Sequence, residues 1–321
     1  MKNRIALFAS LCALFCLIFA SADVIDCARS ALRLCAELIL PSLFPFFVLS
    51  ILLSKLGLPA LLGRLLSPAA ARLFGVSGAG VSALFIGLCG GYPMGAAYIA
   101  EMYGDGSIGR EEAERLLGFC NNSGPAFIVG AVGAGVFGSA AVGLLLYAVH
   151  ISAAVITGLL LPKKRVSAAT PAPRAKPLPF SAALPQAVRQ AVSSVLAVCG
   201  FVVCFTVLAG LLDARGYFSL LSGTISAALG TELHFSRALL TGILELGSGV
   251  GAMRGLSASP ANLALAAGML GWGGVSVQFQ TMALLCDTEI KSSLHLAGRT
   301  MSAFISAVLA YFSACVFSIF P

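Results

Sequence analysis

Glu245 is a carboxylate in the middle of an otherwise apolar segment, residues 239–250. An ionised side chain at that depth in a bilayer costs about 3 kcal/mol or more, and such residues usually face a cavity inside the protein. The position predicts a proton or cation site, or a polar anchor for the tip of a hairpin. A protonated glutamate that is hydrogen-bonded to a neighbouring helix is the alternative, and the sequence leaves both open.

Glycine and proline interrupt the apolar segments at four places, two in each half of the chain. The first half contains the runs 87–95, with Gly-Gly-Tyr-Pro, and 119–125, with Asn-Asn-Ser-Gly-Pro. The second half contains the Gly-rich runs 246–251 and 271–276. A bilayer offers no water to freed N–H and C=O groups, so broken helices persist there only inside protein or around a cavity. Breaks in matching positions of two halves indicate a transporter-like substrate site.

The residues around these breaks could bind a small polar molecule. Asn and Ser supply donors and acceptors, and the free N–H groups at the start of a half-helix favour an anion. A capped surface loop is the alternative for 121–125. Gln278 and Gln280 are two residues apart, so at most one of them faces the site if this part is helical. The predicted substrate-binding residues are Gly91, Tyr92, Pro93, Asn121, Asn122, Ser123, Gly124, Glu245, Ser248, Trp272, Gly273, Ser276 and Gln278.

The composition excludes a soluble domain. Hydrophobic residues make up 59% of the chain and charged residues only 10%, whereas soluble domains contain about 25% charged residues. The net charge of +7 resides in short loops, where basic residues orient a membrane protein, so we expect no nucleic-acid partner. The ten cysteines form no C-x-x-C pair and the three histidines are scattered, so we expect no metal and no cofactor. Gly104-Asp105-Gly106 suggests an intramembrane aspartyl protease, but no second aspartate is placed in mid-helix, so we expect no enzyme.

Apolar runs of about twenty residues predict spanning helices. These runs are 5–22, 36–54, 78–100, 140–161, 188–211, 235–255 and 295–320. The Gly-rich stretches 116–138 and 260–286 predict re-entrant hairpins, with ordinary spanning helices as the alternative. Segments 58–74 and 217–230 predict short interfacial helices. The expected fold is an all-α polytopic membrane protein with about seven transmembrane helices plus two re-entrant hairpins.

Positive charge predicts the orientation, because Lys and Arg remain on the cytoplasmic side. The start of the chain and the basic stretch 163–178 are expected inside, and the acidic stretch 101–114 outside. The two halves then have the same element order and opposite orientation, which is an inverted repeat. The expected division is 1–29 as a retained N-terminal signal-anchor helix, 30–162 as the first repeat, 163–185 as a cytoplasmic linker and 186–321 as the second repeat. A signal peptide cleaved at Ala20-Ser-Ala22 is the alternative for the first helix.

Four stretches of the sequence carry a resemblance to a known family. They are residues 40–47 (Leu-Pro-Ser-Leu-Phe-Pro-Phe-Phe), 90–96 (Gly-Gly-Tyr-Pro-Met-Gly-Ala), 114–125 and 271–278 (Gly-Trp-Gly-Gly-Val-Ser-Val-Gln). From about residue 30 onward the chain resembles the YlbJ-type sporulation integral membrane proteins, which belong with the nucleoside-recognition (Gate) domain proteins. The resemblance implies that both repeats are Gate-like.

The same resemblance implies a role in endospore formation, namely the export of dipicolinic acid from the mother cell across the outer forespore membrane. The protein would then be a multi-pass cell-membrane transporter of a small organic anion. A transporter of a nucleoside or another neutral solute is one alternative, and a non-transporting membrane scaffold for spore maturation is another. The expected partners are the small-molecule substrate, dipicolinate or a similar anion, and membrane lipid; a homo-oligomer is possible.

Overall fold

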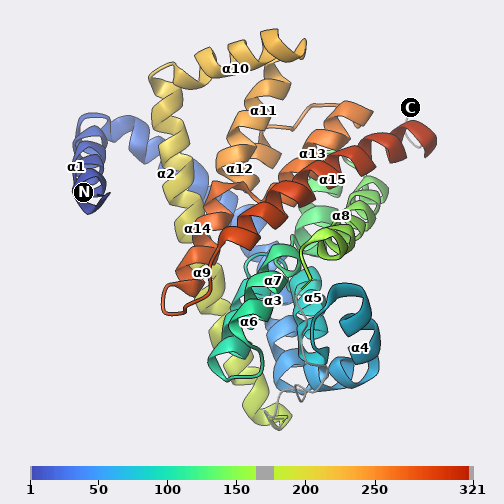
Figure 1. The fold of residues 1–321 in the computed structure, drawn as a ribbon. Coiled ribbons are helices and arrows are strands. Elements are labelled where there is room, and N and C mark those ends of the chain that lie inside the picture. Colours follow the sequence, from blue (N-terminus) through green and yellow to red (C-terminus); the bar gives the residue numbers. More distant parts are fainter. Residues whose placement is uncertain (1, 164–176, 318–321) are drawn as a thin grey trace.

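The computed structural model describes residues 2–163 and 177–317, which are almost entirely helical and contain no strand (Figure 1). The helices are α1 (Lys2–Phe19), α2 (Ser21–Leu34), η1 (Cys35–Ile39), α3 (Leu40–Lys55), α4 (Leu58–Phe74), α5 (Gly78–Gly90), α6 (Met94–Gly104), α7 (Arg110–Cys120), η2 (Ala126–Ala134), α8 (Ala140–Leu160), α9 (Phe180–Ala214), α10 (Tyr217–Leu229), α11 (Leu233–Leu244), α12 (Leu246–Gly251), α13 (Pro260–Trp272), α14 (Gly274–Leu285) and α15 (Ser293–Phe317). The predicted all-α class is confirmed. The basic residues Lys164, Arg165, Arg174 and Lys176 of the predicted linker lie outside the described residues.

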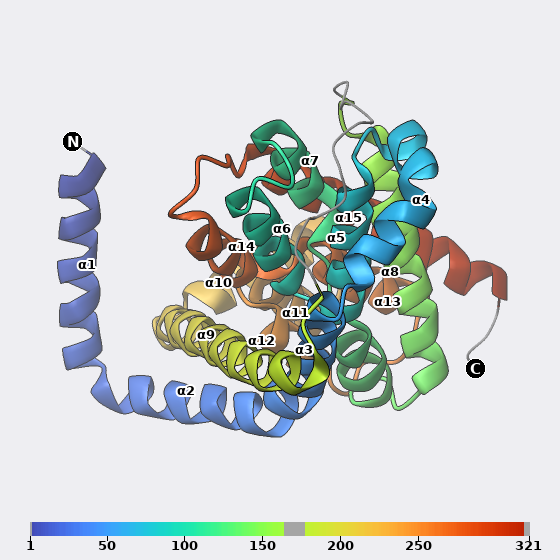
Figure 2. The same ribbon diagram turned by 90° about the horizontal axis from the view of Figure 1, so that it is seen from below.

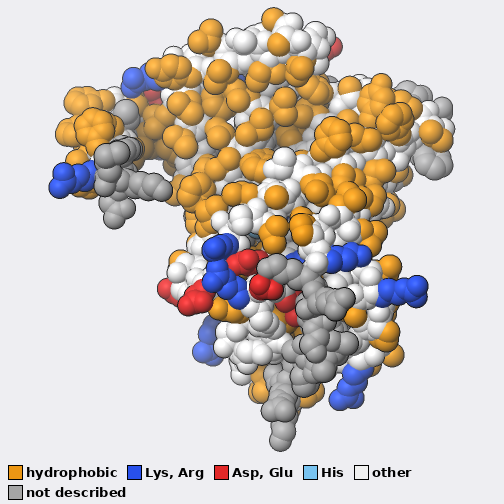
Figure 3. Space-filling model, viewed as in Figure 1, with side chains coloured by type: hydrophobic (Ala, Val, Ile, Leu, Met, Phe, Trp, Pro, Cys, Tyr) orange, Lys and Arg blue, Asp and Glu red, His pale blue; other side chains and the backbone are white. Residues whose placement is uncertain are grey.

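The surface of the bundle is that of a membrane protein. Four helices in the described ranges are long and apolar enough to cross a membrane, and a fifth span results if the bent pair α4 and α5 is counted as one. These four are Ser21–Lys55, Ala140–Leu160, Phe180–Ala214 and Ser293–Val316. Hydrophobic side chains cover the upper part of the molecule in Figure 3, and charged side chains gather at the lower end. Several membrane-capable helices are therefore present, whereas the predicted number of about seven is not confirmed.

The chain turns back at Gly91-Tyr92-Pro93, so α5 and α6 form a hairpin. Gly91 has a φ of 85°, a left-handed conformation that glycine adopts without strain. The N–H of Ser77, at the start of α5, donates to Glu112 near the start of α7 at 2.6 Å. A short loop joins the end of α6 to α7, so the start of α5 and the end of α6 lie on the same side of the bundle. The prediction of one spanning helix over 78–100 is therefore wrong.

This turn places the acidic residues at the end of α6 beside Leu178, which precedes α9, at one end of the bundle. Lys55, Glu101, Asp105 and Leu178 line the same pocket, and the N–H of Leu178 donates to the carbonyl of Lys55 at 2.9 Å. The prediction that 101–114 and 163–178 lie on opposite sides is contradicted by the described ends of the second segment, while residues 164–176 lie outside the described residues. Its physical basis was weak, because acidic residues contribute little to membrane orientation, which follows Lys and Arg. We call this side the charged end.

The segment 116–138 is a broken span rather than a hairpin. Helix α7 and η2 pack along α8 one after the other: Gly133 of η2 lies against Gly143 at the start of α8, and Phe119 of α7 lies against Gly158 near its end. The two arms therefore leave the break at 121–125 in opposite directions. The prediction of a re-entrant hairpin here is corrected, because hydropathy marks where a helix breaks but not where the next arm points.

The second half repeats this pattern. The ring Nε2 of His234 at the start of α11 lies 2.6 Å from the carbonyl oxygen of Ala252, just beyond α12, so α11 and α12 form a hairpin with Glu245 at its tip. Helix α13 packs antiparallel to α15, with Gly271 against Ala303. Helix α14 continues to the charged end, where the N–H of Lys291 donates to Glu114 at 3.1 Å. The segment 260–286 is thus also a broken span, and 235–255 is the hairpin.

The two halves have the same order of elements and run in opposite directions. Helices α3 and α9 pack antiparallel, with the start of α9 beside Lys55 and Cys199 beside Cys35. The counterpart helices α4 and α10 cap opposite ends of the bundle (Figure 1). This arrangement is the one expected of an inverted repeat. Helix α1 stands apart from the bundle and is joined to it through α2 (Figure 2).

Close backbone contacts hold the first hairpin against α7, and they predict a large effect of one methyl group. A Cβ atom on Gly87 would collide with the carbonyl group of Cys120. We expect Gly87→Ala to destabilise the protein by about 1–3 kcal/mol, because the obstacle is backbone. Gly200→Ala is the matched control: it lies inside α9 with nothing within 4 Å, and alanine favours a helix by up to about 1 kcal/mol. Unfolding temperatures in detergent check both, and equal values for the two variants would contradict this packing.

Candidate functional site

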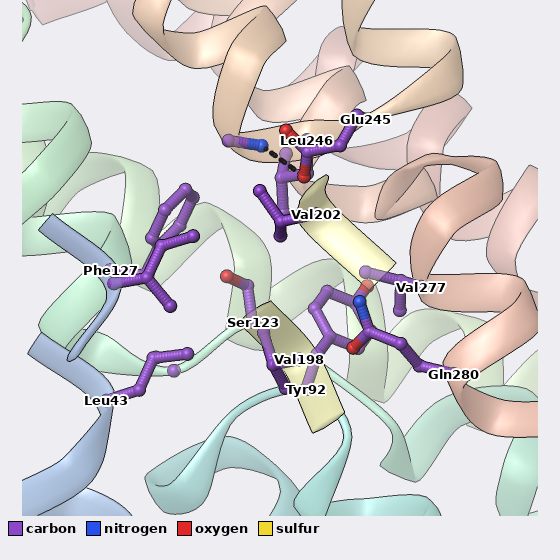
Figure 4. Close-up of a pocket in the computed structure, with 13 residues that line it drawn as sticks. Leu43, Tyr92, Ser123, Phe127, Val198, Val202, Glu245, Leu246, Val277 and Gln280 are labelled. Atoms are coloured by element: carbon purple, nitrogen blue, oxygen red, sulfur yellow. Dashed lines mark hydrogen bonds between the residues drawn. The ribbon is translucent and has the colours of Figure 1, made fainter. Parts of the chain in front are cut away.

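The tips of both hairpins and the break of the first broken span meet around a small cavity in the middle of the bundle (Figure 4). Its volume is about 50 Å³, which holds a water molecule or two. Both hairpin tips and one broken span contribute to it, together with α14, α9 and α3. The lining residues are Ile39, Leu43, Tyr92, Ser123, Gly124, Phe127, Val198, Val202, Glu245, Leu246, Gly247, Val277 and Gln280.

Glu245 forms the tip of the second hairpin and caps the short helix that follows. Its two carboxylate oxygens accept from the N–H of Gly247 at 2.9 Å and from the N–H of Ser248 at 2.5 Å. The residue is only 2% exposed. A carboxylate at a helix N-terminus satisfies freed N–H groups and favours the positive end of the helix dipole. Of the predicted roles for Glu245, the polar anchor of a hairpin tip is the one that this geometry supports.

Tyr92 extends from the first tip toward the breaks of the second half. Its hydroxyl donates to the carbonyl of Leu270 at 3.1 Å, and its ring packs over Gly273, where a Cβ atom would lie 3.2 Å from the ring. Gly273 has a φ of 84°, so glycine is favoured there by both the backbone conformation and the close approach of the ring. Tyr92 thus joins the first tip to the second broken span.

The first broken span presents its polar residues to three different neighbours. The carbonyl oxygen of the Asn121 side chain accepts from the N–H of Ala96 at 3.3 Å, and its amide donates to Thr281 at 2.9 Å. The N–H of Ser123 donates to the ring of His150 at 3.0 Å. Ser123 and Gly124 line the cavity, whereas Asn121 fastens the break to α6 and α14.

Arg299 of α15 is a fully buried guanidinium beside these residues, and the sequence reasoning missed it. Its Nη1 donates to the hydroxyl of Tyr92 at 3.1 Å and to the side-chain oxygen of Asn122 at 3.2 Å, and Nη2 donates to the carbonyl of Gly118 at 3.1 Å. Its Nε has no hydrogen-bond partner within the described ranges. The available signal was an arginine inside the apolar run 295–320, since ionisable residues in spanning segments usually mark a site.

No carboxylate lies within ion-pair distance of Arg299 in the parts of the chain that the structure describes. The other buried arginine differs, because Arg115 donates to the carbonyls of Phe74, Leu161, Pro162 and Gly158 and so closes the ends of two helices. Burying a charge without a counter-charge is costly. Among the described residues, the guanidinium of Arg299 therefore has only neutral hydrogen-bond acceptors, one of which is the cavity-lining Tyr92.

Several predicted residues lie away from the cavity. Trp272 lines a lateral apolar groove between α11, α13 and α15, and its indole N–H donates to the carbonyl of Ile243 at 3.0 Å. The amide of Gln278 donates to the carbonyl of Trp272 at 2.7 Å. Gln280, with a free carbonyl oxygen, is the glutamine that lines the cavity. Ser248 pairs with Thr206 at 3.0 Å. Trp272, Gln278 and Ser248 therefore do not line this cavity, and substrate binding by them stays a prediction.

The remaining predicted residues form the wall behind the cavity. Gly91 packs against Gly124, where a Cβ atom on Gly91 would lie 2.8 Å from the Gly124 nitrogen. Pro93 precedes α6, and Ser276 accepts from the amide of Gln280 at 3.3 Å. Across residues 2–163 and 177–317 no group of three or more His, Cys, Asp or Glu side chains could hold a metal ion. Substrate binding by any of these residues stays a prediction.

The fold and the site define an integral membrane protein whose inverted halves bring broken helices together at a buried polar centre. The chain is 31% identical over 310 residues to the sporulation integral membrane protein YlbJ of Bacillus subtilis (strain 168), a match that covers 88% of this chain and 76% of that protein. The chain belongs to the YlbJ family of sporulation integral membrane proteins. No protein-family model matches it, and no solved structure does.

Proposed function

We propose that this protein transports a small organic anion across a cell membrane during sporulation, with dipicolinate exported from the mother cell as the substrate. The buried guanidinium of Arg299 is the observation that carries this proposal. It lies where the first tip and the first broken span meet, and its acceptors within the described parts of the chain are all neutral. An anionic cargo would supply the missing counter-charge and offset the cost of burying the cation.

The chemistry of the surrounding side chains supports an aromatic carboxylate. Arginine pairs with a carboxylate in a planar two-point geometry, which lysine does not reproduce. Tyr92 supplies an aromatic face at the cavity, and Ser123 and Gln280 supply polar groups beside it. The membership of the YlbJ family supports a sporulation role for this membrane protein. The outer forespore membrane, the direction of export and transport in place of catalysis are parts of the proposal.

A nucleoside or other neutral solute is the second candidate substrate. The free carbonyl oxygen of Gln280 and the Ser123 hydroxyl at the cavity suit hydrogen bonding to an uncharged molecule. A neutral cargo would leave the charge of Arg299 uncompensated, which favours the anion. A non-transporting membrane scaffold is the third reading, and it would need no buried polar centre.

Uptake of radiolabelled dipicolinate by proteoliposomes that contain the purified protein tests the proposal. We expect saturable uptake that excess unlabelled dipicolinate abolishes and excess uridine leaves unchanged. Empty liposomes give the background. Uptake of labelled uridine without dipicolinate uptake would favour the nucleoside transporter. Background uptake of both compounds, by protein that elutes as a single species from a sizing column, would favour the scaffold.

A further inference from the structure

One face of α3 leads from the charged end of the bundle to the central cavity. Leu43, Phe47, Ser50 and Ser54 are spaced by three or four residues and therefore lie on one side of the helix. Leu43 lines the central cavity. Ser54 lines a pocket that opens at the charged end. This stripe of α3 thus runs from the central cavity to the pocket at the charged end.

The pocket at the charged end has two parts. The outer part has a volume of about 270 Å³ and is lined by residues of α3, α6 and the start of α4. The inner part, of about 20 Å³, shares Ser54, Lys55, Tyr98 and Glu101 with it and reaches inward to Ser50, Met94 and Gln190. The two parts therefore form one tapering vestibule between α3, α6 and α9.

Along α3, Phe47 comes between Leu43, which lines the central cavity, and Ser50, which lines the inner vestibule. It is 0% exposed and lies one helical turn from Leu43 on one side and from Ile51 on the other. Met94 faces the inner vestibule from α6, two residues beyond the cavity-lining Tyr92. The cavity of about 50 Å³ is far smaller than usual ligand pockets of about 300–1,000 Å³. A cargo therefore needs these side chains to move before it can enter.

Toward the opposite end of the bundle, α9 is hydrogen-bonded to the second hairpin. Val198 and Val202 of α9 line the cavity, and Thr206, one turn further along the same face, is hydrogen-bonded to Ser248 of α12 at 3.0 Å. Helix α9 and the second hairpin are the counterparts of α3 and the first hairpin. A hydrogen bond joins the first pair, whereas the vestibule lies between the second pair. The vestibule opens at the charged end and reaches inward to Ser50 and Met94.

We infer that the vestibule between α3, α6 and α9 is the path by which the cargo reaches the cavity, and that the ring of Phe47 is its inner gate. This inference rests on the proposed transport function. By the positive-inside rule Lys55, at the mouth of the vestibule, marks the cytoplasmic side. A cargo exported from the cytoplasm would therefore enter here.

Thiol labelling tests the path without any transport measurement. Leu43→Cys, Ser50→Cys and Ser54→Cys are made singly in a cysteine-free background and labelled with a membrane-impermeant methanethiosulfonate in inverted vesicles, which expose the cytoplasmic face. We expect fast labelling at position 54, slower labelling at 50 and almost none at 43. Labelling in right-side-out vesicles should be low at all three. Equal rates at 43 and 54, or faster labelling from the outer face, would overturn the path.

The gate is tested by Phe47→Ala combined with Leu43→Cys. We expect labelling at position 43 to rise at least tenfold, because removing the ring joins the vestibule to the cavity. The control is Phe46→Ala, since Phe46 is 38% exposed on the outer face of α3. Phe47→Leu, which keeps most of the side-chain volume, should give a smaller rise and guards against misfolding. An equal rise for the Phe46 and Phe47 variants, or no rise with Phe47→Ala in protein that elutes normally from a sizing column, would overturn the gate. Dipicolinate uptake is measured separately, so a labelled path without uptake rejects the transport function alone.

Discussion

Arg299→Gln is expected to slow dipicolinate uptake at least about 30-fold, because truncating one partner of a buried charge pair costs about 2–5 kcal/mol. The variant removes the positive charge that the proposed anion compensates. It also removes the donors to Tyr92, Asn122 and Gly118. Arg299→Lys keeps the charge but not the planar fork, and we expect it to retain more uptake than Arg299→Gln. Initial uptake rates at equal reconstituted protein give the comparison.

Arg254→Gln is the matched control for Arg299, because Arg254 is an exposed arginine in the turn beyond α12. We expect its uptake to equal that of the wild type. The unfolding temperatures of all three variants separate a binding defect from a folding defect. Normal uptake by Arg299→Gln would contradict the anion site. Loss of uptake in equal measure by the glutamine and lysine variants, with lowered unfolding temperatures, would assign Arg299 to packing of the breaks instead.

Glu245→Gln is expected to destabilise the second hairpin by about 1–3 kcal/mol and to slow uptake with it. Both carboxylate oxygens accept a backbone N–H, whereas a glutamine side chain has one acceptor and leaves one buried N–H without a partner. Glu232→Gln is the matched control, because Glu232 also precedes a helix but makes no side-chain capping bond. The unfolding temperature in detergent should fall for the Glu245 variant alone.

The same variant tests the predicted proton role of Glu245. If the carboxylate carries a proton during transport, the wild-type uptake rate depends on pH and the rate of Glu245→Gln does not. If Glu245 only anchors the tip, both proteins show the same pH dependence and differ in stability. Unchanged stability together with unchanged uptake in Glu245→Gln would contradict both roles, and the hairpin tip would then need no carboxylate.

The sequence by itself determined the class of protein and the positions of the breaks. Long apolar runs require helices that satisfy their own backbone groups in lipid, so the all-α membrane fold follows from composition. Gly91, Asn121–Pro125, the run 246–251 and Gly273 were identified as interruptions because glycine, proline and polar residues are poor choices inside a spanning helix. The convergence of the two tips and two breaks in space agrees with their matching positions in the two halves.

The tertiary structure decided which breaks reverse the chain. In the sequence, the reversal at Gly91-Tyr92-Pro93 and the continuation through Asn121–Pro125 are both short interruptions that contain glycine and proline, and hydropathy does not show which of them reverses the chain. The difference lies in the partners: α6 packs back on α5, whereas η2 leaves α7 and packs on the start of α8. These contacts are long-range, and no local propensity encodes them. In both halves the structure has a hairpin where a spanning helix was predicted and a broken span where a hairpin was predicted. The two halves therefore still have the same order of elements in opposite orientation.

The tertiary structure also decided which polar residues belong to the central site. Gln280, rather than Gln278, faces the cavity because of the helix rotation after Gly273. Trp272 turns outward to the lateral groove. Arg299 reaches Tyr92 across more than half of the chain. Sequence spacing fixes neighbours on one helix, but the meeting of separate helices depends on how their surfaces pack, and that packing placed the guanidinium of Arg299 against the cavity-lining Tyr92.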